Sequence, residues 1–196
     1  EVLCEIGPDA SEAAPAVEWF RGWVYELGSD KCQKAAEKAL RRIGPVKEST
    51  LVDKLKDKTL AVRWGAARLL GLQEAKSGEA VTALTETVTS DKEIAVQIAA
   101  AEALGNMGPT ASGAASVLAR ALKNLDNYEF HDSSLGKYYS ARNEIPLTIV
   151  IALGKMGKGA AVAIPAVEWF HKSVWSLGEK KYQEAAEKTL RKLRGE

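Results

Sequence analysis

The chain repeats a long stretch of its own sequence. Residues 1–45 align with residues 151–195 without a gap, and 21 of the 45 positions are identical. The identical positions include the hexapeptide PAVEWF, which occurs at Pro15–Phe20 and again at Pro165–Phe170. A likeness of this length indicates that the two ends of the chain are copies of one structural unit. Internal repetition therefore restricts the fold more than any other feature of this sequence.

A shorter signal recurs between the two ends. Helical runs with small residues end on a leucine that is often followed by glycine, as in ALGNMGP (103–109) and ALGKMGK (152–158). Small residues let two helices approach closely, and glycine suits the left-handed residue that follows a helix. The pattern therefore predicts a series of packed helices. The anchoring leucines are Leu40, Leu70, Leu104, Leu153 and Leu190, at spacings of 30, 34, 49 and 37 residues.

An amphipathic segment precedes each of these runs. In the first unit Val17, Phe20 and Val24 lie on one stripe at helical spacing. No alternating pattern typical of strands lies beside these segments. We therefore predict an all-α chain of about five helical hairpins in one continuous domain. The expected repeats are residues 8–44, 46–74, 76–108, 109–157 and 158–196, and residues 1–7 are expected to end a preceding repeat.

The segment AVRWGAARLLG (61–71) resembles the second helix of HEAT-like repeats, in particular the short type named after phycobilisome lyases. The pairs Val62–Arg63, Ala66–Ala67 and Leu70–Gly71 carry the resemblance, and AVQIAAAEALGNMG (95–108) matches again with glutamine in place of the arginine. The resemblance covers nearly the whole chain. It implies a right-handed α–α superhelix, a HEAT-like solenoid whose second helices line a concave face. Such repeats serve scaffolds, adaptors and a few enzymes, so the fold alone does not assign a function.

Composition narrows the class of partner. The formal net charge of +1 argues against a dedicated nucleic-acid-binding protein without excluding a local basic patch. No run of about 18 apolar residues occurs, so we expect no membrane span. Cys4 and Cys32 lack the second pair or the nearby histidines of a metal pattern, and we expect neither a metal nor a cofactor. The compartment stays open, with the cytoplasm slightly favoured.

The first candidate site is a stripe on the second helices. Aligning these helices on their leucines places Trp64, Ile98 and Leu147 at one position, with Lys34 and Glu184 at the two ends. Four residues further on lie Lys38, Arg68, Glu102, Ile151 and Lys188. An exposed tryptophan beside an arginine is typical of interaction hot spots. The alternative is that these side chains pack under the neighbouring repeat.

The second candidate site is an insertion. The spacing between Leu104 and Leu153 exceeds the others by 12 to 19 residues, and the extra length falls at 127–144, between the two helices of the fourth repeat. Long polar loops rich in aromatic residues are common recognition elements. The alternative is a tolerated insertion that its aromatic residues hold against the surface. We expect Pro146 in the first turn of the helix that follows. The candidate residues are Tyr128, Phe130, His131, Tyr138 and Tyr139.

The third candidate site is a pair of basic patches on the second helices of the first and last repeats. Such patches can hold phosphates or an acidic segment of a partner, although a solvated helix face gives the same pattern. The residues are Lys31, Lys34, Lys38 and Arg41 in the first repeat and Lys181, Lys188 and Arg191 in the last.

Catalytic patterns are scarce. The segment GKMGKGA (154–160) lacks the frame of a phosphate-binding loop, and its counterparts at 105–111 and 4–10 identify it as the turn between repeats. The segment HDSS (131–134) lacks a Gly-x-Ser-x-Gly elbow, and two histidines in the chain do not make a histidine-rich metal site. Bilin lyases remain open by fold analogy alone.

We therefore expect a non-enzymatic scaffold that binds a protein, a peptide or another copy of itself on a concave helical surface. The first alternative is nucleic-acid binding through the basic patches, which predicts steep salt dependence. The second alternative is an architectural segment of a longer repeat array.

Overall fold

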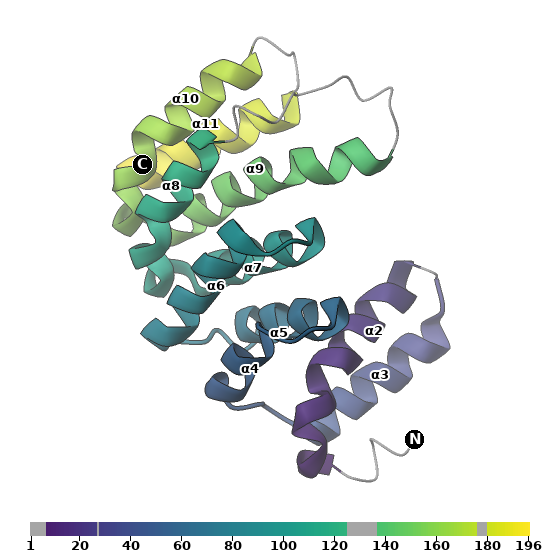
Figure 1. Cartoon of the computed structure of the whole chain (residues 1–196). Coiled ribbons are helices and arrows are strands. Elements are labelled where there is room, and N and C mark those ends of the chain that lie inside the picture. Colours follow the sequence, from purple (N-terminus) through teal and green to yellow (C-terminus); the bar gives the residue numbers. More distant parts are fainter. Residues whose placement is uncertain (1–6, 27, 125–136, 176–179) are drawn as a thin grey trace.

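The computed structural model describes residues 7–26, 28–124, 137–175 and 180–196, and within these ranges the chain contains helices and no strand (Figure 1). The all-α prediction is confirmed. The α-helices are α2 (Ala14–Glu26), α3 (Asp30–Ile43), α4 (Glu48–Lys54), α5 (Leu60–Leu72), α6 (Gly78–Ser90), α7 (Ile94–Met107), α8 (Ala115–Lys123), α9 (Lys137–Met156), α10 (Ile164–Trp175) and α11 (Lys180–Arg194). The 3-10 helices are η1 (Gly7–Ala13), η2 (Gly108–Ala114) and η5 (Gly157–Ala163).

From α4 onward the helices alternate between two layers. The first helices α4, α6, α8 and α10 pack in sequence order in one layer, and the second helices α5, α7, α9 and α11 form the other (Figure 1). Each hairpin contacts its neighbours in the sequence, which is the arrangement of a solenoid. Residues 1–6 lie outside the described part of the chain, and so does the prediction that they end a preceding repeat.

Glycines set the spacing of the second helices. The residue after the anchoring leucine is Gly71 in α5, Gly105 in α7 and Gly154 in α9. Each of them lies against the residue before the leucine of the next second helix. These contacts are Gly71 with Ala103, Gly105 with Ala152 and Gly154 with Thr189. The missing side chains therefore allow the close stacking that the Leu-Gly pattern predicts.

The first hairpin joins the stack in a different way. It is α2, the first helix of that hairpin, that packs beside α5, and α3 lies on the far side of α2 (Figure 1). The contact is very close, because a side chain on Gly65 would overlap the backbone of Pro15. The sequence of α3 explains the difference, since the exposed Arg41 follows its leucine where α5, α7 and α9 have glycine. A bulky residue there prevents the close stacking that α5, α7 and α9 show.

A buried ion pair connects two successive repeats. Arg63 of α5 donates to both carboxylate oxygens of Asp91, at 2.7 and 3.1 Å, and these bonds raise the pKa of Arg63 above its ordinary value. Arg63 also donates to the backbone carbonyls of Asp57 and Lys58, in the loop between the two helices of its own hairpin. In α7 the equivalent Gln97 keeps one such bond, to the carbonyl of Asp91 at 2.6 Å. The arginine that carried the family resemblance is therefore a structural residue.

The helix after the insertion begins earlier than expected. The helix α9 starts at Lys137, so Pro146 is a buried residue inside it rather than a member of its first turn. The prediction for Pro146 is wrong because proline removes one helical hydrogen bond without ending the helix here. Residues 137–144, which the sequence placed in the insertion, are helical for the same reason.

One helical stretch, Glu144–Val174, is long and apolar enough to cross a membrane by length and composition alone. It contains the end of α9, the 3-10 helix η5 and most of α10, and Gly157 between them has a positive φ of 65°. Half of its most apolar window is buried inside the fold. The core helices of a helical protein give the same pattern, and this stretch supplies the core of the last two hairpins.

Candidate functional site

A groove crosses α5, α7 and α9 on the side of the second helices. Its volume is about 300 Å³, at the lower end of the roughly 300–1,000 Å³ of small-molecule pockets. The floor lies where α7 and α9 approach most closely, at Gly105 and Ala152. The remaining lining residues are Arg68, Glu102, Asn106, Thr148, Ile151 and Lys155. We refer to these eight residues as the α5–α9 groove.

The repeat register explains which residues line the groove. Arg68, Glu102 and Ile151 each lie two residues before the anchoring leucine of their helix, and Asn106 and Lys155 lie two residues after it. At 100° per residue both positions point away from the leucine and the core. Three successive second helices therefore present equivalent positions side by side. The sequence alignment identified the first position, but it missed Asn106, Thr148 and Lys155.

The polar residues of the groove pair with each other around one exposed aliphatic side chain. Arg68 forms an ion pair with Glu102 at 2.8 Å, and the ammonium group of Lys155 donates to the Asn106 side-chain oxygen at 2.8 Å. Ile151 of α9 is 43% exposed. An exposed apolar side chain surrounded by polar groups suits a partner with an apolar anchor and a polar surround.

Trp64 does not stand free on the surface. Its indole is half-buried against the core, and a side chain on Gly22 of α2 would lie 2.8 Å from its ring. The guanidinium carbon of Arg68 lies 5.4 Å from the centre of the ring, as the sequence predicted for this pair. The expectation of an exposed hot spot is thus corrected for Trp64, because α2 occupies the space beside α5. The residue joins the first hairpin to the rest of the chain.

Arg68 also belongs to this joint. Its guanidinium lies 3.9 Å from the carboxylate of Glu18 on α2, which is buried and which Arg21 binds through two hydrogen bonds. These bonds raise the pKa of Arg21 above its ordinary value. The two arginines and the two glutamates, Glu18 and Glu102, balance in charge. One end of the α5–α9 groove is therefore a neutral ion-pair cluster over Trp64.

The other apolar residues of the expected stripe are less accessible than predicted. Leu147 is buried, and Ile98 is half-buried and packs against the core. The expectation that they form an exposed strip is wrong. The position six residues before the anchoring leucine lies only about 20° around the helix axis from the glycine after that leucine. In α9 this glycine is Gly154, which faces α11. The outward position is the one that Ile151 occupies.

The aromatic residues of the insertion are not part of the described surface. Tyr128, Phe130 and His131 lie outside the described residues, and so do the side chains of Tyr138 and Tyr139 at the start of α9. Their proposed role in recognition stays a prediction.

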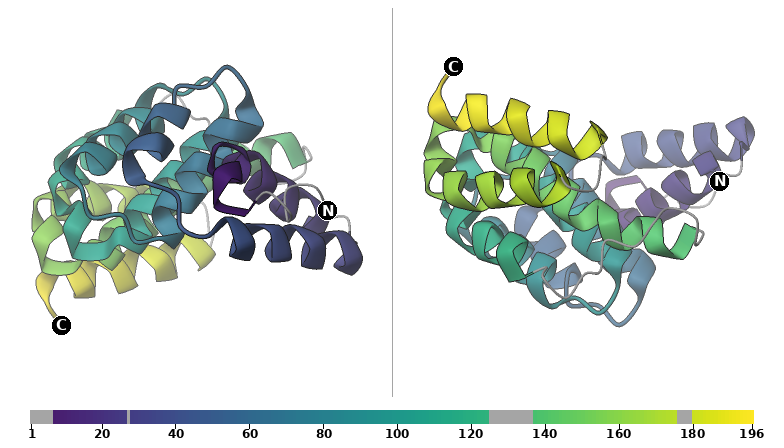
Figure 2. Two further views of the ribbon diagram at one scale, coloured as in Figure 1. Left: turned by 90° about the horizontal axis from the view of Figure 1, so that it is seen from below. Right: turned by 90° about the horizontal axis from the view of Figure 1, so that it is seen from above.

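The basic patches are exposed, and none of their residues lines the α5–α9 groove. Lys31, Lys34, Lys38 and Arg41 project from α3, and Lys181, Lys188 and Arg191 project from α11. In both views of Figure 2, α3 and α11 lie along the same side of the molecule, one at each end. Because α3 does not lie beside α5 in the layer of second helices, the expected continuous stripe from Lys34 to Trp64 is interrupted.

Among the described residues, no group of three or more His, Cys, Asp or Glu side chains could hold a metal ion. His171 lies 3.5 Å from Glu187 at the end of the molecule opposite α2. The carboxylate of Glu102 lies in the groove and that of Glu18 lies beside it. Each of them faces an arginine.

Comparison with known proteins supports a helical repeat fold. Residues 48–130 match the family model of HEAT repeats. A crystal structure of an engineered protein matches with a TM-score of 0.53 and 22% identity, covering 98% of this chain and 87% of that one. A second engineered protein matches with a TM-score of 0.52 and 22% identity, covering 87% of this chain and 46% of that one. No curated protein matches the sequence of this chain.

The fold and the repeat pattern define an all-α solenoid of the HEAT-like class. This chain is a HEAT-like repeat protein, and the HEAT match contains four of the eight residues of the α5–α9 groove, Arg68, Glu102, Gly105 and Asn106. The finer resemblance to the phycobilisome-lyase type stays a prediction. HEAT repeats generally act as protein-interaction scaffolds.

Proposed function

We propose that this protein is a non-enzymatic scaffold that binds a segment of another protein in the α5–α9 groove. The observation that carries the proposal is Ile151, which is 43% exposed in a groove that also contains the Arg68–Glu102 ion pair and the Asn106–Lys155 hydrogen bond. Burying this side chain against an apolar residue of a partner would remove exposed apolar surface without leaving a polar group unpaired.

The groove also defines the chemistry of the segment. Lys155 is exposed and binds only a neutral amide within the described residues, so an acidic group of the partner can bind its ammonium group. Arg68 and Glu102 neutralise each other at the opposite side. The segment that fits best has one aliphatic anchor for Ile151 and an acidic residue directed to Lys155.

The experiment compares three forms of the full chain as bait in a lysate of the source organism, with and without nuclease. The forms are the wild type, Ile151→Glu in the groove, and the matched control Val162→Glu at an exposed aliphatic residue of η5. We expect a protein that the wild type and Val162→Glu retain and that Ile151→Glu loses. Equal retention by all three forms would exclude the groove.

Nucleic acid is the second candidate partner, favoured by the position of α3 and α11 along one side of the molecule. Their exposed lysines and arginines could follow a phosphate backbone, with an affinity that falls steeply as salt rises. Material that nuclease releases from the bait, and that Lys38→Glu with Arg41→Glu fails to retain, would favour this candidate over the groove.

A further inference from the structure

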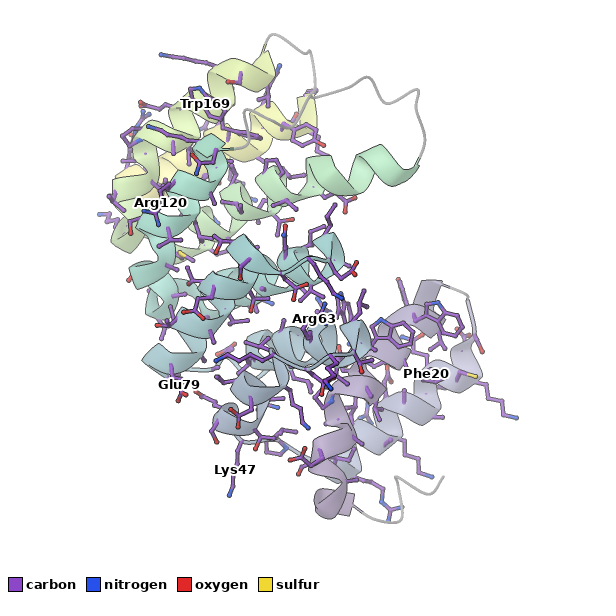
Figure 3. All side chains as sticks on the ribbon, in the orientation of Figure 1. Phe20, Lys47, Arg63, Glu79, Arg120 and Trp169 are labelled. Atoms are coloured by element: carbon purple, nitrogen blue, oxygen red, sulfur yellow. The ribbon has the colours of Figure 1, made fainter. Side chains whose placement is uncertain are left out.

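The first and last hairpins share one sequence unit but bury different residues of it. Phe20 of α2 is 38% exposed, whereas the equivalent Phe170 of α10 is 1% exposed. One turn earlier on the same side, Ala16 is exposed and its equivalent Ala166 is buried. Figure 3 labels Phe20 and Trp169, which lie at opposite ends of the stack of helices. The same side chains therefore meet a protein core at one end and solvent at the other.

The last hairpin shows what covers this side of the unit. The helix α10 packs on α8, the first helix of the hairpin before it. The packing residues of α8 are small or aliphatic, and Ala115, Leu118 and Leu122 are fully buried. Phe170 also meets Tyr182 of α11 edge-on, with ring centres 6.3 Å apart, so the side of the unit that contains Ala166 and Phe170 lies between the preceding hairpin and its own second helix.

The opposite side of the unit faces a following hairpin. In α2, Pro15 is buried against α5 and Gly22 lies against Trp64. In α10 the equivalent Pro165 and Lys172 are exposed, because no described helix follows α11. Each unit thus has two stacking sides, and each copy shows one of them occupied. In α2 the side for the preceding hairpin is open.

The open side of α2 is richer in aromatic residues than its counterpart. Trp23 is 47% exposed and stacks on Trp19 with ring centres 5.9 Å apart and planes within 7°. The ring centre of Phe20 lies 6.4 Å from that of Trp23. In α10 the equivalent of Trp23 is Ser173. Exposed clusters of large aromatic side chains are characteristic of protein interfaces.

We propose that the face of α2 formed by Ala16, Trp19, Phe20 and Trp23 is the docking site of a HEAT-type hairpin stacked ahead of α2 in the repeat order. The first helix of that hairpin presents an alanine–leucine face like that of α8. A second copy of this chain cannot supply its own α8 for this purpose, since α10 covers it. This docking is independent of the α5–α9 groove, which lies on other helices.

The sequence offers a direct probe of the proposal. Because residues 1–45 align with 151–195 without a gap, residues 109–150, which contain α8 and most of α9, can be joined ahead of Glu1 in the register of the fourth and fifth repeats. The full chain and this extended chain are compared by amide hydrogen exchange. We expect exchange of the α2 amides to slow by about tenfold or more in the extended chain, as local opening of α2 becomes coupled to the added hairpin.

Variants separate docking from general stabilisation. Phe20→Glu and, as a second variant at a smaller residue, Ala16→Glu should each abolish the slowing in the extended chain. Tyr25→Glu is the matched control, since Tyr25 is 69% exposed on another side of α2. In the extended Tyr25→Glu chain, exchange of the α2 amides should slow as it does in the extended wild type. No slowing, or slowing that survives both Ala16→Glu and Phe20→Glu, would overturn the proposal.

Sedimentation of the unextended chain tests the remaining occupant. We expect a monomer at all concentrations in which α2 amides exchange rapidly. A dimer that Ala16→Glu dissociates and Tyr25→Glu does not would show that a second copy covers this face, and it would overturn the proposal of an α8-type hairpin.

Discussion

Gly71 of α5 and Ala103 of α7 are in such close contact that a β-carbon on Gly71 would lie 2.6 Å from the α-carbon of Ala103. The opposing atom belongs to the backbone, so the two helices would have to separate to make room. The same relation recurs between α7 and α9 and between α9 and α11. The stack of second helices therefore depends on one glycine in each of α5, α7 and α9.

The first prediction concerns this glycine. Gly71→Ala should lower the free energy of unfolding by about 1–3 kcal/mol, the usual cost of overpacking. Gly78→Ala is the matched control, because no atom lies within 4 Å of the added carbon at the start of α6. It should stabilise the protein by about 0.5–1 kcal/mol. Chemical denaturation of both variants measures the difference, and equal stabilities would contradict the proposed role of Gly71.

The second prediction concerns the buried ion pair between repeats. Arg63→Gln copies the residue that α7 has at this position and keeps a donor for the loop carbonyls, but it leaves the buried carboxylate of Asp91 without its cation. The free energy of unfolding should fall by about 3 kcal/mol. Lys54→Gln removes a solvent-exposed pair with Glu12 and should cost much less, because water screens such a pair. Similar losses for the two variants would mean that the Arg63 pair is no stronger than a surface pair.

The third prediction concerns the joint between the first hairpin and the rest. Trp64→Ala removes the ring that fills the space beside Gly22 and should destabilise the first hairpin by about 2 kcal/mol, roughly half the cost for a fully buried tryptophan. Amide exchange should accelerate in α2 and α3 while α7 changes little. Tyr25→Ala, at an exposed residue of α2, should leave amide exchange unchanged. Uniform acceleration along the chain would show that Trp64 does not act at this joint.

The fourth prediction concerns pH. The backbone amides of Lys76 and Ser77 donate to the carboxylate of Glu48 at 3.0 and 3.1 Å. A hydrogen bond with the Ser77 side chain, followed by the bond with the Lys76 amide, lowers the pKa of Glu48 below its ordinary value of 4.5. The folded pKa is thus below the unfolded one, so these bonds contribute stability above pH 4.5 that is lost as the pH falls through the folded pKa.

Glu48→Gln should therefore reduce the loss of stability below pH 4.5 relative to the wild type. Glu86→Gln, at an exposed residue of α6, serves as the control. Thermal unfolding between pH 3 and 7 measures both (about half-unit steps resolve a single titration). If the Glu48→Gln and wild-type curves remain parallel, Glu48 does not contribute to the acid sensitivity of the fold.

The periodic features of the sequence predicted the fold well. The Leu-Gly endings of α5, α7 and α9 indicated close stacking of the second helices, and Gly71, Gly105 and Gly154 lie at those contacts. The same pattern contained the exception, since α3 has Arg41 where these helices have glycine. The alignment treated all five hairpins as equivalent and so missed that α2 takes the place beside α5.

The site was harder to predict because it depends on small rotations about the helix axis. Ile151 and Leu147 are both apolar and one turn apart, yet Ile151 is exposed and Leu147 is buried. Periodicity identifies the core side of a helix, but which flank the next helix covers depends on how the helices stack. Trp64 and Arg68 were correctly expected to lie together, while the approach of α2 to them has no local sequence signal.

The central claim is that the α5–α9 groove binds a partner through Ile151. The most direct measurement is the affinity of the captured partner for the wild type, Ile151→Glu and Val162→Glu by titration calorimetry. The account predicts at least about tenfold weaker binding for Ile151→Glu, or about 1.4 kcal/mol, and unchanged binding for Val162→Glu. Equal affinities for all three forms would contradict it.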